Sequence, residues 1–384
     1  MSMDLIEFRR DLHRHPEVGF DLTRSRARVA EVLEAAGLDV TRDVGGGVVA
    51  SLWRGAGNRP AIGLRADMDA LPIDEAGESP WRSTAPGAFH GCGHDGHTAM
   101  LVGAALELSR DDTLDRNVHF IFQPDEEAGN GARAMIADGL FERFPMGNIY
   151  GMHNMPGMAL GHFATQPGPF CAFEDNFGIR IVGQGGHASM PEAGVDAIVV
   201  GAAVVGALQG IVSRAVSPRD HAVVSVTEFI TDGARNIIAS NVILRGDCRG
   251  FSRDVSQVIR RRMEEIVAGV CAAHGARGEV EYGTSFVPLI NDPDATATAV
   301  AAAAQVGAAN AEHGRVGFSE DFAAFLDHCP GAFVLMGNGE EGRAAMPLHN
   351  PHYDFNDAAL PHGVAFWCAL ARGEGESDLG GGAP

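Results

Sequence analysis

The order of the predicted strands and helices is the feature that most limits how this chain can fold. Between residues 48 and 154, short apolar and β-branched runs alternate with helical segments. Such alternation is typical of an α/β layer with a mainly parallel sheet. The predicted strands are VVASLW (48–53), AIGLRAD (61–67), VHFIFQ (118–123) and NIYGMHN (148–154), and a helix is predicted over 97–109.

A different order of elements follows. It comprises a strand and loop at 177–189, a helix at 195–213, strands at 221–230 and 241–251, a helix at 253–274 and a strand at 280–289. This β-α-β-β-α-β order is the split-βαβ, ferredoxin-like plan of a small α+β domain with its own antiparallel sheet.

The α/β pattern then resumes, with an Ala-rich helix at 295–312 and a strand at 332–337. The tail, 373–384, is predicted to be disordered. We therefore predict one discontinuous domain formed by 1–175 and 291–384, and an inserted domain formed by 176–290.

Composition and charge disfavour two kinds of partner. The sequence has 50 acidic and 29 basic residues, a formal charge of −21, and no run rich in Lys or Arg. Nucleic acids and anionic membranes are bound by basic patches, so we expect neither as a partner. The longest apolar stretch, 197–212, contains Gln209 and is short for a bilayer span, which predicts a buried helix. Six cysteines without a CxxC spacing predict reduced thiols in the cytoplasm.

Polar clusters sit where the strands of the first domain end, and sites in open α/β sheets form outside the carboxyl ends of strands. These clusters are ADMD (66–69), GCGHD (91–95), QPDEE (123–127) and MHN (152–154), with LHNPHYDF (348–355) after the last strand. Their common edge makes them candidates for a single site.

The GCGHD cluster pairs a thiol with an imidazole. In an extended segment, Cys92 and His94 would lie on the same face because one residue separates them. A thiolate and an imidazole suit zinc and neighbouring first-row metals. The alternative is a polar surface loop that is rich in histidine.

The QPDEE cluster places two carboxylates side by side. Glu126 and Glu127 point in different directions, so that one can bind a metal while the other faces a substrate; the alternative is a solvated acidic turn. His153 and His349 would each fit a structural role if taken alone. One Cys, three His and paired carboxylates at one sheet edge together predict a metal site. Asp69 can orient a ligating histidine, or simply cap a strand.

Eight motifs in order resemble one metallopeptidase family. They are LHRHPEVGF, GLRADMDALPI, FHGCGHDGHTAML, FQPDEEAGNGARAMI, GMHN, GGHASMP, SEDFA and LHNPHYDFND, spread over about residues 5 to 370. The series resembles the aminoacylase/carboxypeptidase family, in the amidohydrolase branch with hippurate hydrolases and indoleacetyl-amino-acid hydrolases. Two departures are NIIAS (236–240), which lacks the usual proline, and Asp125, where a small residue is frequent.

The resemblance implies a role for each motif. The implied ligands of two divalent ions are Cys92, His94, Glu127, His153 and His349. Glu126 matches the general base and Asp69 the orienting aspartate, whereas Asp67 stands where other branches have a ligating His. On the inserted domain, His187 resembles the histidine that polarises the scissile carbonyl. Asn236 and Arg249 resemble groups that hold the substrate's carboxylate or carbonyl.

The resemblance also implies a reaction. It is metal-dependent hydrolysis of the amide bond of N-acyl or N-aroyl amino acids, with Zn²⁺ or Mn²⁺ as the metals and Co²⁺ or Ni²⁺ as alternatives. The discontinuous domain would be catalytic, and 176–290 would be a lid that joins a homodimer, with His187 completing the partner's site. Alternative functions are a dipeptidase or carboxypeptidase, a decarbamoylating or deaminating hydrolase, and a metal-binding protein without turnover.

Overall fold

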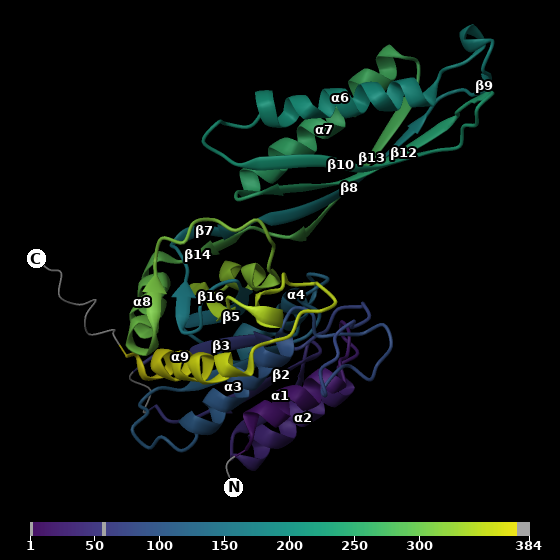
Figure 1. Ribbon diagram of the computed structural model, residues 1–384. Helices are drawn as coiled ribbons and strands as arrows, with labels where there is room; N and C mark the ends of the chain where they lie inside the picture. The colour runs from purple at the N-terminus through teal and green to yellow at the C-terminus, as the bar shows by residue number, and fades with distance from the viewer. Residues whose placement is uncertain (1–2, 56–58, 375–384) are drawn as a thin grey trace, which may run out of the picture. The chain divides into compact units, whose positions relative to one another are not determined.

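The computed structural model describes residues 3–55 and 59–374 and divides the chain into two compact units (Figure 1). Unit 1 comprises Met1–Phe170, Ile290–Gly314 and Asp321–Pro384, and unit 2 comprises Cys171–Leu289 and Arg315–Glu320. Unit 2 is therefore inserted into unit 1, and it takes in the short segment 315–320, which the sequence had placed with the first domain. Of the tail predicted to be disordered, 375–384 lies outside the described residues.

An eight-stranded sheet forms the centre of unit 1. Its strand order is β1-β2-β4-β3-β5-β16-β6-β15. The central neighbours β4, β3, β5 and β16 run parallel, while β1, β2 and the β16–β6 pair are antiparallel. The strands are β1 Asp39–Val44, β2 Gly47–Leu52, β3 Ile62–Asp67, β4 Val118–Gln123, β5 Asn148–Pro156, β6 His162–Ala164, β15 Ala308–Asn310 and β16 Gly331–Gly339. β7 Gly168–Cys171 and β14 Leu289–Asn291 form a separate two-stranded sheet.

Helices bury the central strands of this sheet. β2, β3 and β4 are buried along their whole length, as expected for strands covered on both faces. The main apolar core joins residues of the sheet to residues of five helices. These are α1 Leu5–Arg14, α2 Thr23–Ala35, α3 His94–Leu108, α8 Pro293–Val306 and α9 Leu360–Arg372; the shorter α4 Gly131–Ala137 and α5 Leu140–Arg143 also belong to the unit. The predicted α/β class is confirmed.

Two predicted helices have other limits. The helix expected at 97–109 begins at His94, because Gly93 adopts a left-handed conformation (φ 92°) that ends the preceding loop. The Ala-rich helix expected to reach 312 ends at Val306, and the next residues form β15. Pairing of β15 with β6 outweighs the helix preference of alanine there. A Cβ on the intervening Gly307 would lie 2.1 Å from the Gly161 carbonyl oxygen.

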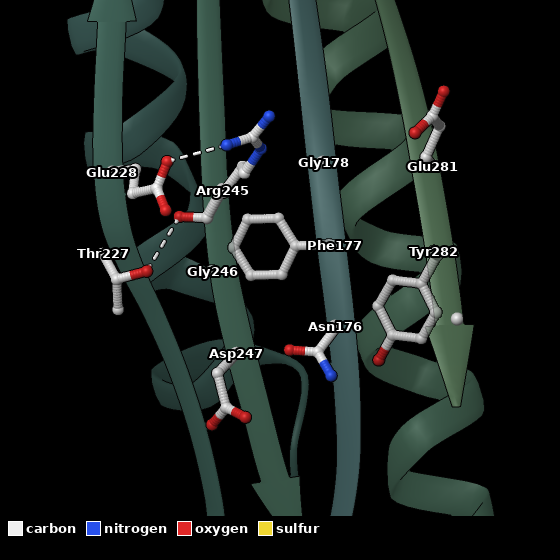
Figure 2. A pocket seen from close by; sticks show the side chains of 11 residues that line it. Asn176, Phe177, Gly178, Thr227, Glu228, Arg245, Gly246, Asp247, Glu281 and Tyr282 are labelled. Atoms are coloured by element: carbon white, nitrogen blue, oxygen red, sulfur yellow. Dashed lines mark hydrogen bonds and ion pairs between the residues drawn. The ribbon is translucent and has the colours of Figure 1, made fainter. Parts of the chain in front are cut away.

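Unit 2 has the predicted split-βαβ order. Its elements are β8 Phe173–Val182, α6 Ala197–Arg214, β10 Ala222–Thr231, β12 Asn241–Gly250, α7 Arg253–Ala273 and β13 Arg277–Phe286. The antiparallel sheet has the order β10-β12-β8-β13, and α6 and α7 pack on one of its faces. Figure 2 shows the other face, where Gly178 lies between Arg245 and Glu281 and leaves a hollow of about 600 Å³. A separate two-stranded antiparallel sheet, β9 Gly186–His187 with β11 Ile237–Ile238, also belongs to this unit.

Helix α6 is buried on one side only. Val200, Val204 and Leu208 lie in the core, whereas Ile198 and Val199 are 39% and 54% exposed. The prediction of a buried helix is thus correct for one face and wrong for the other. By length and composition alone, α6 is also apolar enough to cross a membrane.

Candidate metal centre

Two neighbouring parallel strands deliver five carboxylates to one edge of the unit 1 sheet. Asp67 ends β3 and pairs with Gln123 at the end of β4, so the segments that follow them leave the sheet together. Asp69 follows β3. Asp125 turns the chain after β4 with a positive φ of 46°, a conformation that Asp tolerates better than most residues. After this turn, Glu126 and Glu127 both approach His94 Nε2, at 4.0 and 3.8 Å.

The start of α3 brings Cys92 and His94 to the same place. The two residues are not on one face of an extended segment, as the sequence argument assumed, because the left-handed Gly93 separates them. A side chain at Gly93 would collide with Asn154 Oδ1 at 2.4 Å, so only glycine allows the turn. The turn nevertheless places potential ligand atoms of Cys92, His94 and His153 within 4.8 Å of one another.

His153 lies within β5 rather than after it. Its Nδ1 donates to the Asn154 carbonyl oxygen at 2.7 Å, which leaves Nε2 to face the Cys92 sulfur at 3.4 Å. An imidazole whose far nitrogen is held by a carbonyl is the usual arrangement of a metal-ligating histidine.

Glu127 links this group to the loop that carries His349. Glu127 Oε1 is 3.8 Å from His94 Nε2, and Glu127 Oε2 is 3.5 Å from His349 Nε2. His349 has a positive φ of 66°, and its N–H donates to the Gly91 carbonyl at 2.9 Å. Glu126 Oε2 lies 4.0 Å from His94 Nε2. The candidate ligands therefore form overlapping groups, Cys92–His94–His153, His94–Glu126–Glu127 and Cys92–Glu127–His349.

Buried polar atoms without partners test whether a cation fits these groups. His94 Nε2 and Glu127 Oε1 are both buried, and neither has a hydrogen-bond partner among the described residues. Burial raises the pKa of Glu127 to about 7. Burial alone would lower the pKa of His94, but the Asp67 and Asp69 carboxylates raise it to about 10. In the protein without metal, protons on these groups offset the buried negative charge. A divalent cation would displace these protons and offset the charge in their place. The donor set of thiol, imidazole and carboxylate fits such a cation.

Asp69 and Asp67 lie behind His94 and differ in how they are held. Asp69 Oδ1 is 3.4 Å from His94 Nδ1, and Asp69 Oδ2 accepts the Glu127 backbone N–H at 3.2 Å. The Asp67 carboxylate accepts hydrogen bonds from Arg65 Nη1 at 2.7 Å and from His97 Nδ1 at 2.6 Å. Both oxygens of Asp67 are therefore engaged by the protein.

The sequence argument left His97 and Arg65 without a role. His97 is held between Asp67 and Asn154, whose backbone N–H it accepts at 3.0 Å. It follows His94 by three residues on α3, a spacing that puts both rings on one helix face. This three-residue spacing was the sequence signal that could have identified His97. Arg65, on β3 before Asp67, offered no comparable one.

Unit 2 carries the other three candidates, and it does not gather them. His187 in β9 lies close to Asn236, which directly precedes β11, and the Ala188 N–H donates to the Asn236 carbonyl at 3.1 Å. Arg249 lies near the far end of β12, roughly 25 Å along the strand from Asn241 at a rise of about 3.3 Å per residue. Its guanidinium binds Glu174 at 2.7 Å and Asp247 at 3.0 Å.

His187 has a defined tautomer. Its Nδ1 accepts the Ser189 backbone N–H at 3.2 Å and lies 2.8 Å from the Ser189 hydroxyl. A backbone N–H can only donate, so the neutral ring carries its proton on Nε2. The exposed imidazole of His187 is therefore a hydrogen-bond donor through Nε2.

Comparison with known proteins decides the family. Residues 63–373 match Peptidase family M20/M25/M40. The chain belongs to this family. The predicted resemblance is thereby confirmed for most of the chain.

Several curated relatives of this M20 member are named as amidohydrolases, deacetylases or hydrolases, and one is named as a carboxypeptidase. An N-acyl-L-amino acid amidohydrolase of Geobacillus stearothermophilus is 39% identical over 335 residues, covering 84% of this chain and 89% of the relative. A hippurate hydrolase of Campylobacter jejuni subsp. jejuni is 34% identical over 369 residues, covering 95% of each chain. A solved Bacillus subtilis structure, described as a dinuclear metal binding peptidase from the M20 family, has a TM-score of 0.82 and 32% identity over 96% of both chains.

Proposed function

We propose that this M20 member is a metal-dependent amidohydrolase that cleaves N-acyl or N-aroyl amino acids into a carboxylic acid and a free amino acid. The observation that carries the proposal is a buried thiol–imidazole–carboxylate cluster with a second carboxylate, Glu126, beside the candidate ligand Glu127. A protein that only stored or sensed metal would have no use for Glu126 next to a complete ligand set. Relatives named as amidohydrolases on N-acyl amino acids support the substrate class.

Two divalent ions, Zn²⁺ or Mn²⁺ with Co²⁺ or Ni²⁺ as alternatives, would be held by Cys92, His94, Glu127, His153 and His349. Bound there, they would lower the pKa of a water molecule toward neutrality and polarise the substrate carbonyl. The overlapping ligand groups that share Cys92, His94 and Glu127 support two adjacent ions. The relative described as dinuclear supports the same number. Asp69 would orient the His94 ring from behind, at the observed separation of 3.4 Å.

Glu126 would act as general base and then as general acid. Its carboxylate lies near His94 Nε2, on the side of the ring opposite Asp69. There it can accept a proton from the attacking water and pass it to the leaving amine. Its side chain is only 8% exposed, so bulk water competes little for that proton. Glu127 would keep to metal binding, because its two oxygens face His94 and His349.

His187 would stabilise the oxyanion that develops on the scissile carbonyl, through the N–H of Nε2. Asn236, close to His187 at the β9–β11 pair, would hold the substrate's carboxylate or carbonyl. Arg249 would share that role, although Glu174 and Asp247 occupy its guanidinium in this structure.

We further propose that unit 2 is a lid that joins a homodimer, with His187 of one subunit completing the site of the other. Apolar side chains exposed on α6 and on the edge strand β10 support this, because such edges are usually covered. They are Ile198, Val199, Val223, Phe229 and Ile230. The six cysteines, all free, support a reducing, cytoplasmic setting.

A substrate panel with metal depletion tests the function. N-acetyl and N-benzoyl amino acids should release amine with a higher kcat/KM than dipeptides or N-carbamoyl compounds that carry the same amino acid. A chelator should abolish release, and added Zn²⁺ or Mn²⁺ should restore it. Preference for dipeptides would instead favour a peptidase, and preference for N-carbamoyl compounds a decarbamoylating hydrolase. If the protein binds metal but cleaves none of these substrates, it is a metal-binding protein without turnover.

A further inference from the structure

The N-terminal helix α1 buries an arginine that contacts three acids from two distant parts of unit 1. Arg9 is fully buried; its Nη1 lies 2.8 Å from Asp95 and 3.3 Å from Asp354, and its Nε lies 2.6 Å from Asp357. His13, one turn later on the same helix, places Nδ1 2.8 Å from the same oxygen of Asp95. Of this cluster only His13 lies in the LHRHPE motif (12–17), and the cluster has no role in the proposed reaction.

One of the three acids is next to a candidate metal ligand, and the other two follow a second candidate ligand along the chain. Asp95 directly follows His94 in the first turn of α3. Asp354 lies in the segment after His349, next to Tyr353. Tyr353 in turn accepts the Asn154 side-chain amide at 2.6 Å, beside His153 on β5. Arg9 therefore sits where the His94 helix and the His349 segment meet.

We propose that Arg9 is a positioning residue for the metal centre. Through Asp95 on one side and Asp354 and Asp357 on the other, it sets the separation of His94 from the segment that carries His349. The inference rests on the proposed function, since it assumes that these histidines bind metal. A planar guanidinium suits this task because its donors are fixed in direction, unlike those of a lysine ammonium. Groups behind metal ligands typically change metal affinity when they are altered.

The adjacent Arg10 offers a matched control. It also binds Asp357, with Nε at 3.0 Å and Nη2 at 2.7 Å, and its guanidinium stacks over Trp81 at 3.6 Å. Among the described residues, Arg10 has Asp357 as its one ion-pair partner, and it is 30% exposed. It thus shares the anchoring of α1 but not the contact with Asp95 beside His94.

The experiment compares full-length Arg9→Lys, Arg9→Met and Arg10→Met with the wild type. Zn²⁺ affinity is measured by chelator competition, the visible absorption of the Co²⁺-loaded protein reports ligand geometry, and thermal unfolding of the metal-free protein reports folding. We expect Arg9→Lys to bind Zn²⁺ about ten- to a hundredfold more weakly and to shift the Co²⁺ bands. Arg10→Met should match the wild type in both, and the metal-free Tm of Arg9→Lys should fall no further than that of Arg10→Met.

Arg9→Lys keeps the charge, so the comparison stands even where Arg9→Met does not fold. Wild-type affinity and spectrum in Arg9→Lys would overturn the inference, as would equal weakening in Arg10→Met or failure of both Arg9 variants to fold. If the wild type binds metal and the Arg9 variants bind it equally well, only the positioning role is refuted. A wild type that binds no Zn²⁺ or Co²⁺ refutes the proposed function and this inference with it.

Discussion

Glu126→Gln should abolish turnover while leaving metal content near that of the wild type. Glutamine has the size of glutamate, so the buried site keeps its packing and loses only the basic carboxylate. General-base help contributes about a hundredfold to ten-thousandfold in rate. At about 1.36 kcal/mol per factor of ten, this raises the barrier by about 3 to 5 kcal/mol. Glu126 is buried and its Oε2 lies 4.0 Å from His94 Nε2, at the candidate metal centre. We therefore expect the rate to fall at least about a hundredfold.

Glu127→Gln, unlike Glu126→Gln, should lose bound metal as well as activity. Both oxygens of Glu127 face histidines, Oε1 towards His94 and Oε2 towards His349, so its anionic charge is central to the ligand groups. Removing that charge should reduce bound metal, measured by elemental analysis after dialysis, and activity together. Asp125→Asn is the matched control, because it removes an adjacent carboxylate that hydrogen-bonds Asn130 instead. Its kcat should stay within a fewfold of the wild type.

The assay follows amine release from N-acetyl amino acids at saturating metal, with metal stoichiometry measured on the same samples. Near-wild-type turnover in Glu126→Gln would refute the assignment of the base. Metal lost from Glu126→Gln but kept in Glu127→Gln would mean that the two roles are exchanged.

Three further outcomes are expected. Cys92→Ser should lower metal content and activity together, because a serine hydroxyl is a poor anionic ligand at neutral pH; unchanged stoichiometry by elemental analysis would remove Cys92 from the ligands. Burial alone would lower the pKa of His13, but Asp95 raises that pKa to about 9. Protonated His13 therefore stabilises the folded state fully below pH 6.5, and this stabilisation is lost as the pH rises through 9. The free energy of unfolding in urea should fall by about 3 kcal/mol over that range, and His13→Gln should flatten the fall. Inactive Glu126→Gln mixed with inactive His187→Ala should regain activity if subunits share sites; exchange without recovery would show that they do not.

Much of the fold could be predicted because its signals are local. The apolar runs that became β3, β4 and β16 and the split-βαβ order of unit 2 depend on periodicity within short windows. The candidate ligands could also be located, because parallel strands place their carboxyl ends at one edge. Asp69, Glu126 and Glu127 follow from that rule alone.

Other features depend on contacts between residues far apart in the chain. The start of α3 at His94 requires the left-handed Gly93, whose missing side chain makes room for Asn154. Residues 308–310 leave the Ala-rich helix because β6 offers them a pairing edge. No window of sequence contains either partner.

By itself, the sequence determined the two architectures, the family and the residue types that meet at the sheet edge. Only the tertiary structure decided that Asp67 is engaged by Arg65 and His97, and that Arg9 joins the segments of His94 and His349. Strand and helix formation follow from neighbours along the chain. A buried charge, in contrast, is stable only when the whole fold brings it a partner of opposite sign.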